Sequence, residues 1–322
     1  MRLAMNSAAQ ETIRHAKDFR KVVIWGLRRQ WHSHRFIHQG FFETFKSLGI
    51  PVVWTDFASD PGIIEAGDFV ITSNVYGRGT RGNPLAPLKE GAYYCFHGFA
   101  HSGYDGNDRP PRHEIDRKYS LNLEVFLNKA RAASDQWDTV TYFDRPSKTL
   151  HQPWGTNLLE ERFRAPVISR SPFVFWVGAI WNNALNQGNR AEIDELRSAL
   201  RQRSLRFVHL KFIPDCVSIA AIRASRVAPA IAGRWQVENN YLPCRMFKNI
   251  SYGQLGVSNV PEFSGLYRDC TIPGRSVSEL VENALSLSNR DVIELVEAQQ
   301  KVTRRHTYVH KIRNLFRAMS ES

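Results

Sequence analysis

The sequence has few cysteines and no long apolar run. Its 322 residues include four cysteines, at positions 95, 216, 244 and 270, and their wide spacing gives neither a C-x-x-C pair nor a metal-ligand pattern. We therefore expect reduced thiols and a cytosolic protein. No stretch approaches the roughly 18 apolar residues that span a bilayer, and the N-terminus lacks the apolar core of a secretion signal. We expect neither secretion nor membrane spanning.

Several catalytic motifs are also missing. The first apolar run ends in Gly26 without the further glycines of G-x-G-x-x-G, which argues against a dinucleotide-dependent oxidoreductase. H-E-x-x-H, the P-loop and G-x-S-x-G are absent, so hydrolase and NTPase functions lose support. No D-x-D triplet offers ligands for a metal-bridged diphosphate, and we expect neither a metal nor another cofactor.

The chain does carry an excess of positive charge. There are 43 Lys and Arg against 31 Asp and Glu, a net charge of +12, which favours nucleotides, nucleic acid or an anionic membrane surface as partners. A hydrophobic content of 43% and a charged content of 23% are typical of a globular protein, and the length suits two domains.

Short apolar strands alternate with helices in the first half. We expect strands at 21–26, 51–57, 68–73, 92–96 and 139–143, a helix at 36–48, and an exposed leading helix over 8–20. Short strands separated by helices or long loops predict parallel βαβ units. Residues 1–150 are therefore predicted to form a Rossmann-like domain.

The alternation restarts after a proline-containing connection over 145–172. Strands are expected at 173–178, 205–212, 226–232 and 255–258, and helices at 190–203, 218–224, 245–252, 276–286 and 291–319. Ser276 and Glu279 have the spacing of a capping box. The predicted fold class is α/β, with a second Rossmann-like domain over 151–300, a C-terminal helix over 301–322, and a cleft between the domains.

The segment 237–253 is the most informative part of the sequence. It gathers a carboxylate, amides, a tyrosine and two cations at a predicted loop-to-helix junction; these are Glu238, Asn240, Tyr241, Arg245, Lys248 and Asn249. Arg245 and Lys248 are three apart on a helix and share a face, so their charges would converge on one anionic site. Cations and helix-start amides bind phosphate, and a carboxylate accepts from ribose hydroxyls.

A second phosphate contact is predicted after the strand 173–178. That strand ends in Gly178, and the polar loop that follows leads to Arg190 at a helix start. Loops at the carboxyl end of a parallel strand face the ligand crevice, which makes Arg190 a candidate for phosphate binding.

Two resemblances follow from these residues. Phe175-Trp176-Val177-Gly178, an Arg-led helix, and Glu238-Asn239-Asn240 with Tyr241-x-x-Cys244-Arg245 resemble the donor-binding half of GT-B glycosyltransferases, nearest in pattern to the α-1,3-fucosyltransferases. The resemblance implies that Arg190 and Arg245 bind phosphate. Cys244 stands where that family has a ribose-contacting Glu.

Residues 224–258 and 276–284, with the ending that contains His306-Thr307-Tyr308, are similar to group 1 and spore-maturation-type glycosyltransferases. Lys248 replaces the acid of their R-x-F-E segment, which leaves Glu238 as the carboxylate for the ribose. For His306 and Tyr308 the alternative is a capping and packing role.

Acceptor and base are expected in the first half. His97 ends a predicted strand, and Asp105 follows in a glycine-rich loop; either could deprotonate an acceptor hydroxyl. A basic loop with Arg28, Arg29, His32, His34 and Arg35 is a further candidate to contact phosphate or an anionic acceptor.

The sequence thus predicts a metal-independent glycosyltransferase that moves a sugar from a nucleotide-diphosphate sugar to a glycan or glycolipid hydroxyl. It would be cytoplasmic, with peripheral contact to an anionic membrane as a further option. Three alternatives stay open: a nucleic-acid-binding protein, a nucleic-acid glycosyltransferase, and a non-catalytic nucleotide-sugar binder. The dispersed basic residues and missing reader motif argue against the first.

Overall fold

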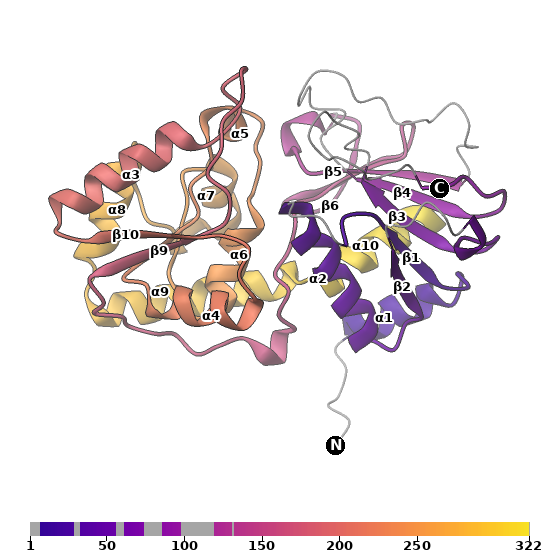
Figure 1. Cartoon of the computed structure of the whole chain (residues 1–322), viewed down its shortest axis with the longest axis horizontal. Helices are drawn as coiled ribbons and strands as arrows, with labels where there is room; N and C mark the ends of the chain where they lie inside the picture. Colours follow the sequence, from indigo (N-terminus) through magenta and orange to yellow (C-terminus); the bar gives the residue numbers. More distant parts are fainter. Residues whose placement is uncertain are drawn as a thin grey trace. The chain divides into compact units, whose positions relative to one another are not determined.

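The chain forms two compact units. The computed structural model describes residues 7–28, 33–55, 61–73, 86–97, 119–130 and 132–321. Unit 1 comprises Met1–Gln152 and Tyr308–Ser322, and unit 2 comprises Pro153–Thr307. Each unit combines β-strands with helices (Figure 1), so the architecture is the expected α/β class.

Unit 1 is built on one mixed sheet. Across it, the described strands run in the order β2 (Val52–Thr55), β1 (Val22–Trp25), β3 (Phe69–Ser73), β4 (Tyr93–His97), β5 (Ser120–Glu124), β8 (Thr149–His151), β7 (Thr141–Asp144) and β6 (Asp135–Asp138). Neighbours from β2 to β8 are parallel, and β7 pairs antiparallel with both β8 and β6. The carboxyl ends of six strands therefore share one edge.

The first four predicted strands are confirmed as β1 to β4. The fifth, 139–143, is β7, and its antiparallel pairing makes the expectation of a parallel βαβ strand wrong there. The strands β5, β6 and β8 were not predicted, because they are short and mix polar with apolar residues. The predicted connection 145–172 consequently begins too early, since β8 still belongs to the sheet of unit 1.

Both faces of this sheet are covered. On one face Val23, Trp25, Tyr94 and Phe96 form a buried cluster with Ile64. On the other, α2 (Ser33–Ser47) and α10 (Tyr308–Ser320) pack through aromatic rings. The ring of Phe316 lies 5.2 Å from that of Phe69 in β3 and 5.9 Å from that of Phe45 in α2.

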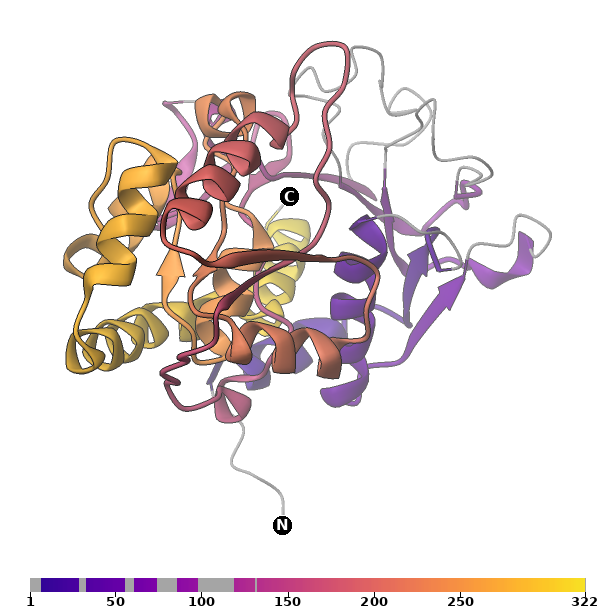
Figure 2. The same cartoon turned by 60° about the vertical axis from the view of Figure 1, so that its left-hand side comes forward.

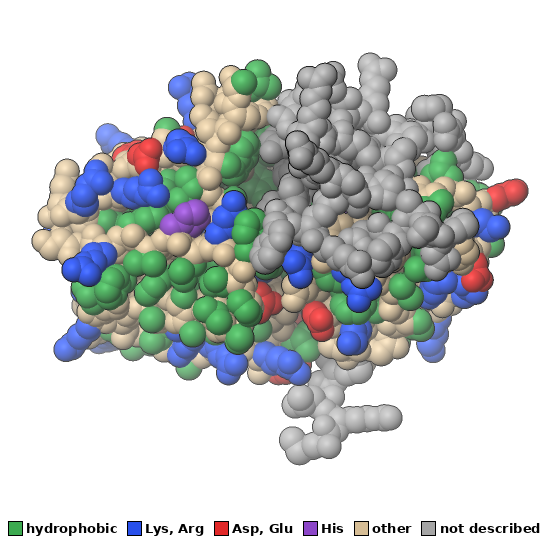
Figure 3. All heavy atoms as spheres, in the orientation of Figure 1, with side chains coloured by type: hydrophobic (Ala, Val, Ile, Leu, Met, Phe, Trp, Pro, Cys, Tyr) green, Lys and Arg blue, Asp and Glu red, His purple; other side chains and the backbone are tan. Residues whose placement is uncertain are grey.

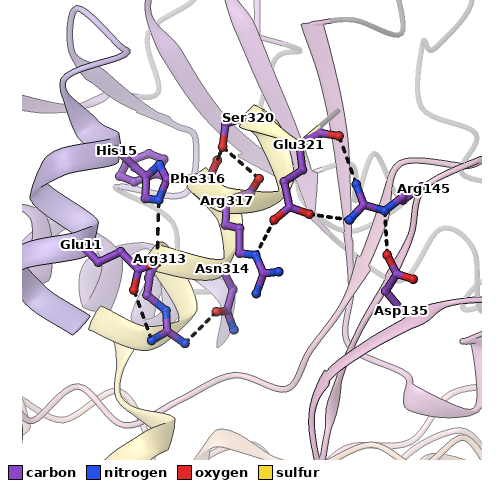
Figure 4. Close-up of polar contacts among 10 residues, drawn as sticks. All are labelled: Glu11, His15, Asp135, Arg145, Arg313, Asn314, Phe316, Arg317, Ser320 and Glu321. Atoms are coloured by element: carbon purple, nitrogen blue, oxygen red, sulfur yellow. Dashed lines mark hydrogen bonds and ion pairs between the residues drawn. The ribbon is translucent and has the colours of Figure 1, made fainter. Parts of the chain in front are cut away.

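Helix α10 is held at both ends. The helix α1 (Ser7–Ala16) packs along it and buries Ala8, Ala9 and Thr12, so the leading helix is not the solvated appendage that its polarity suggested. Near the other end the Glu321 carboxylate bridges Arg317 and Arg145, and Arg145 also binds Asp135 on β6 (Figure 4). Burial acts to raise the pKa of Glu321, but these two arginines lower it overall.

Unit 2 has short parallel strands covered by helices. The strand β9 (Phe173–Val177) pairs parallel with β10 (Arg206–Leu210), and β11 (Ala228–Pro229) pairs parallel with β12 (Gly256–Val257). A hydrogen bond of 2.8 Å from Arg226 N to Phe173 O ties the segment before β11 to β9. The helices are α3 (Arg190–Gln202), α4 (Asp215–Ala224), α5 (Arg234–Glu238), α6 (Cys244–Ser251), α7 (Pro261–Tyr267), α8 (Val277–Ser286) and α9 (Asn289–Thr303). Short 3-10 turns are η1 (Pro61–Ile63) and η4 (Leu127–Lys129) in unit 1, and η5 (Glu160–Arg162), η6 (Arg268–Cys270) and η7 (Arg304–His306) in unit 2.

The helix ends follow local chemistry. Ser276 caps α8 by accepting from Glu279 N at 3.1 Å, which confirms half of the predicted capping box. The Glu279 carboxylate accepts from Arg275 N instead of Ser276 N. The predicted helix 291–319 is instead interrupted by η7 and by Thr307, whose extended backbone forms a bridge with Thr156. Among the described residues, none of the helices has the length and apolar character needed to span a bilayer.

Candidate functional site

The carboxyl end of β9 is shaped by a glycine. Gly178 has φ +135°, a conformation that favours glycine. Its N–H donates to Leu210 O at 3.0 Å, and its carbonyl accepts from His209 Nε2 at 2.6 Å. Both backbone groups of Gly178 are thus fixed to β10, and the chain turns without a side chain at this point.

Arg245 occupies the space that Gly178 leaves. Its Nε donates to Val177 O at 2.8 Å, and its Cζ lies 3.9 Å from the ring centroid of the fully buried Trp176. Burial lowers the pKa of this guanidinium, while the nearby Cys244 and Tyr241 act in the opposite direction. Stacking on an indole face favours a cation, so Arg245 is held in one orientation.

This guanidinium has unused donors. Among the described residues, Arg245 forms no ion pair with a carboxylate, and neither Nη group donates to a protein acceptor. A partly buried cation without an acidic partner is costly. An anionic ligand at the carboxyl end of β9 would supply the partner that the described protein does not.

Lys248 lies on the same face of α6. Cys244, Arg245 and Lys248 are partly buried, whereas Met246 and Phe247 are in the core. In the described part of the chain the Lys248 ammonium makes neither an ion pair nor a hydrogen bond, and its charge is free for the same anion. The helix spacing predicted for this pair corresponds to the face that the structure shows.

The other residues predicted to bind the sugar-nucleotide donor differ in their exposure and contacts. Arg190 is exposed as the first residue of α3. Glu238 is 55% exposed in its side chain and pairs with Arg234 at 2.8 Å. Asn249 is only 1% exposed and donates to Ala228 O at 2.8 Å, which gives it a place in the core. Asn240, with φ +53°, forms the turn between α5 and α6.

A chain of polar side chains that ends at Tyr252, directly after α6, was missed in the sequence. Tyr252 Oη donates to Asn157 Oδ1 at 2.9 Å, and Asn157 Nδ2 donates to Asp215 Oδ2 at 2.8 Å. Burial raises the pKa of Tyr252, and Asp215 and Cys244 raise it further. Asp215 opens α4 just after β10, so a carboxylate does lie at this edge. The position of Asp215 after a predicted strand was the available signal.

The polar loop 178–189 is closed by its own amides. Asn183 Oδ1 accepts from Leu185 N and Gln187 N, and Asn189 Oδ1 accepts from Trp181 N. Figure 2 shows this loop standing beyond the carboxyl end of β9. Its shape is therefore set by internal bonds.

The visible surface carries scattered basic side chains. In the view of Figure 3, Lys and Arg side chains are spread over the described surface and acidic ones are few.

Within the described ranges, no cluster of three or more His, Cys, Asp or Glu side chains could hold a metal ion.

His97 lies at the carboxyl edge of the sheet of unit 1. It ends β4, is fully buried, and its Nε2 lies 2.5 Å from Nε2 of His38 in α2. His38 Nδ1 is 3.0 Å from Gly26 O, which also accepts from Trp54 Nε1 at 2.9 Å. The sequence predicted His97 but gave no sign of His38, because α2 brings that residue in from a different element.

The remaining candidates divide between packing and undescribed segments. Asp105, Arg29 and His32 lie outside the described residues, as does the side chain of His34. Arg28 Nη1 donates to Trp54 O at 2.8 Å, and Arg35 is partly buried in α2. His306 stacks on Phe247 with ring centroids 5.2 Å apart. Tyr308 is buried and packs on Phe41 at 5.0 Å. The last two residues therefore have packing roles.

Comparison with known proteins gives a likeness of fold. No family model and no curated protein matches the sequence. Among solved structures, the N-terminal domain of Candida albicans trehalose-6-phosphate phosphatase matches with 9% identity and a TM-score of 0.46, over 100% of this chain and 95% of that one. The DNA-modifying enzyme β-glucosyltransferase, solved with and without its substrate uridine diphosphoglucose, matches with 11% identity and a TM-score of 0.51, over 93% and 99%. At that identity the likeness to β-glucosyltransferase establishes the fold alone: the chain has an α/β architecture of the GT-B kind.

Proposed function

We propose that the protein is a glycosyltransferase that uses a nucleotide-diphosphate sugar. The observation that carries the proposal is Arg245, a partly buried guanidinium at the carboxyl end of a parallel strand with no acidic partner among the described residues. Ligands of open α/β sheets bind at that end of the strands. The GT-B-like fold and the uridine diphosphoglucose of β-glucosyltransferase support a sugar nucleotide as the anion.

The diphosphate is the natural partner of Arg245 and Lys248. When the bond from the anomeric carbon to the diphosphate oxygen breaks, negative charge grows on the leaving diphosphate. Two cations at the diphosphate would stabilise that growing charge more than they stabilise the ground state. Arg190 and Tyr241 are proposed as further donor contacts, and Asp215 joins Glu238 as a candidate for the ribose hydroxyls. The proposal needs no metal at the diphosphate.

The acceptor hydroxyl is proposed to meet the carboxyl edge of the sheet of unit 1. In a single displacement its oxygen attacks the anomeric carbon, its proton passes to a base, and the nucleoside diphosphate leaves. His97 is the proposed base, and Asp105 remains a second candidate. A glycan or a glycolipid is the proposed acceptor class.

Calorimetric titration with UDP, GDP and dTDP tests the donor site. We expect one nucleoside diphosphate to bind, and Arg245→Met to weaken it by about 10- to 100-fold, since hydrogen bonds to charged groups contribute about 1.5–3 kcal/mol. Methionine keeps an apolar stem over Trp176. Arg290→Met is the matched control, because its side chain is 86% exposed and pairs with Glu294. Unchanged affinity in a folded Arg245→Met protein, or no binding of any nucleotide, would refute the proposal.

Nucleic acid is a second candidate acceptor. The net charge of +12 favours it, and β-glucosyltransferase, which shares the fold, is a DNA-modifying enzyme. Transfer of radiolabelled sugar to duplex DNA, with a rate that falls steeply between about 50 and 200 mM salt, would select this acceptor. Transfer to a glycan or glycolipid extract alone would select the first.

A further inference from the structure

Two imidazoles and a carbonyl form a buried chain in unit 1. Neither His38 nor His97 exposes any surface, and their ring centroids are 4.7 Å apart with planes at 74°. His38 Nδ1 faces Gly26 O at 3.0 Å, and the two Nε2 atoms face each other at 2.5 Å. Three elements meet here: the turn after β1, helix α2, and the carboxyl end of β4.

Hydrogen-bond chemistry determines which ring nitrogens of His38 and His97 carry a proton. A carbonyl oxygen can only accept, so His38 Nδ1 carries the proton of that bond. A neutral His38 then has its lone pair on Nε2. His97 Nε2 must therefore be the donor in the bond between the rings, and a neutral His97 has its lone pair on Nδ1. Charging either ring at full burial is costly, which favours this neutral pair before reaction.

The Gly26 carbonyl, which ends this hydrogen-bonded chain, is itself held in place. Gly26 O accepts from both His38 and Trp54 Nε1, so both of its lone pairs are used. Because Trp54 is at the end of β2, the carbonyl is held between two neighbouring strands. His38 cannot turn its ring over without breaking the bonds to Gly26 and His97 together.

We propose that His38 is a positioning residue that holds His97 in the Nε2–H tautomer and makes Nδ1 its proton-accepting atom. The role of His97 Nδ1 in catalysis rests on the proposed function, whereas the tautomer of His97 does not. In the transfer step the acceptor hydroxyl gives its proton to His97 Nδ1 as its oxygen bonds the anomeric carbon and the diphosphate leaves with the bonding electron pair. The bond from His97 Nε2–H to His38 then becomes charge-assisted and therefore stronger.

The tautomers can be read directly by NMR. Long-range ¹H–¹⁵N spectra of the full chain labelled on histidine, with assignment by single substitutions, distinguish protonated from unprotonated ring nitrogens. We expect Nδ1–H for His38 and Nε2–H for His97. His38→Gln retains an acceptor near the original Nε2, so His97 should keep its Nε2–H tautomer. His38→Phe removes the acceptor, so His97 should populate both neutral tautomers. A wild-type His38 without a proton on Nδ1, or a His97 tautomer unchanged in His38→Phe, overturns the proposal.

Kinetics separate positioning from a merely structural role. His38→Phe should lower kcat by about 10- to 100-fold, less than the roughly 100- to 10,000-fold that a general base itself contributes, because part of the His97 population keeps the required tautomer. The KM for the donor and the affinity for the nucleoside diphosphate should stay within about 2-fold. His38→Gln should recover most of kcat, and His15→Phe on α1 is the matched control. A loss shared equally by His38→Gln and His38→Phe overturns the positioning role. Expected tautomers in a protein that binds no nucleotide would uphold the positioning and refute the transferase. If His38→Phe does not fold, the wild-type and His38→Gln spectra decide alone.

Discussion

Gly178 and Arg245 provide a sharp test of the donor site, because one residue leaves room for the other. A Cβ built on Gly178 would lie 2.3 Å from Arg245 Nη2, whereas ordinary contacts are about 3.5–4.0 Å. Gly178→Ala must therefore move the guanidinium by roughly 1.2 Å or more. The Nη2 atom is the far end of a flexible side chain, so the clash costs little folding free energy. Its main effect is to displace the positive charge of Arg245.

The change in affinity follows from that displacement. A guanidinium moved by more than about 1 Å cannot keep both its 2.8 Å bond to Val177 O and its bonds to a phosphate. Losing charge-assisted hydrogen bonds costs about 1.5–3 kcal/mol, so Gly178→Ala should weaken nucleoside diphosphate binding by about 10- to 100-fold. The φ of +135° adds a separate cost of about 1–3 kcal/mol to folding.

A double-mutant cycle separates the two effects. Calorimetric affinities and melting temperatures are measured for Gly178→Ala, Arg245→Ala and the double mutant. In the Arg245→Ala background there is no guanidinium to displace, so Gly178→Ala should change affinity by less than about 2-fold while still lowering the melting temperature. Gly49→Ala is the control, because Gly49 has φ +70° and no neighbour within 4 Å of a built Cβ. Equal losses of affinity in both backgrounds would refute the assignment.

Two further predictions concern stability in unit 1. A Cβ on Gly40 would lie 2.4 Å from the Tyr308 ring. Gly40→Ala should therefore destabilise the fold by about 1–3 kcal/mol through overpacking, offset in part by the gain of about 1 kcal/mol in helix propensity. The resulting loss in melting temperature should vanish in a Tyr308→Leu background. Burial lowers the pKa of Lys311 to about 8 from 10.5, so the unfolded chain holds a proton between these values that the folded protein lacks, and stability should rise by about 3 kcal/mol as pH increases from 8 to 10.5. Urea unfolding of Lys311→Met should show a stability gain below pH 8 that disappears above pH 10.5; a gain independent of pH would contradict this.

Periodicity was a good guide where elements are amphipathic or strongly apolar. The runs around Val22–Trp25 and Phe173–Val177 became strands, and the spacing of Arg245 and Lys248 placed both on one face of α6. These features depend on neighbours in the sequence, which is the information that a local pattern holds.

Contacts between distant elements were not predictable in this way. His38 reads as one polar residue of a helix, and only the packing of α2 on the sheet brings it to His97. Asn249 looks the same in sequence as any site amide, yet its donation to Ala228 O places it in the core. In both cases the tertiary fold, not the residue type, decides whether a polar group faces a ligand or a neighbour.

The discontinuity of unit 1 has a consequence for biosynthesis. In the sequence, α10 is separated from the sheet that it covers by the whole of unit 2, so the ribosome completes Pro153–Thr307 before the residues that cover Phe69 and Phe45 are made. Unit 2 is continuous and can fold as it emerges, whereas the nascent sheet of unit 1 must wait with part of one apolar face uncovered. A chaperone that shields this face during translation would therefore act on the first half of the chain and be released by the last.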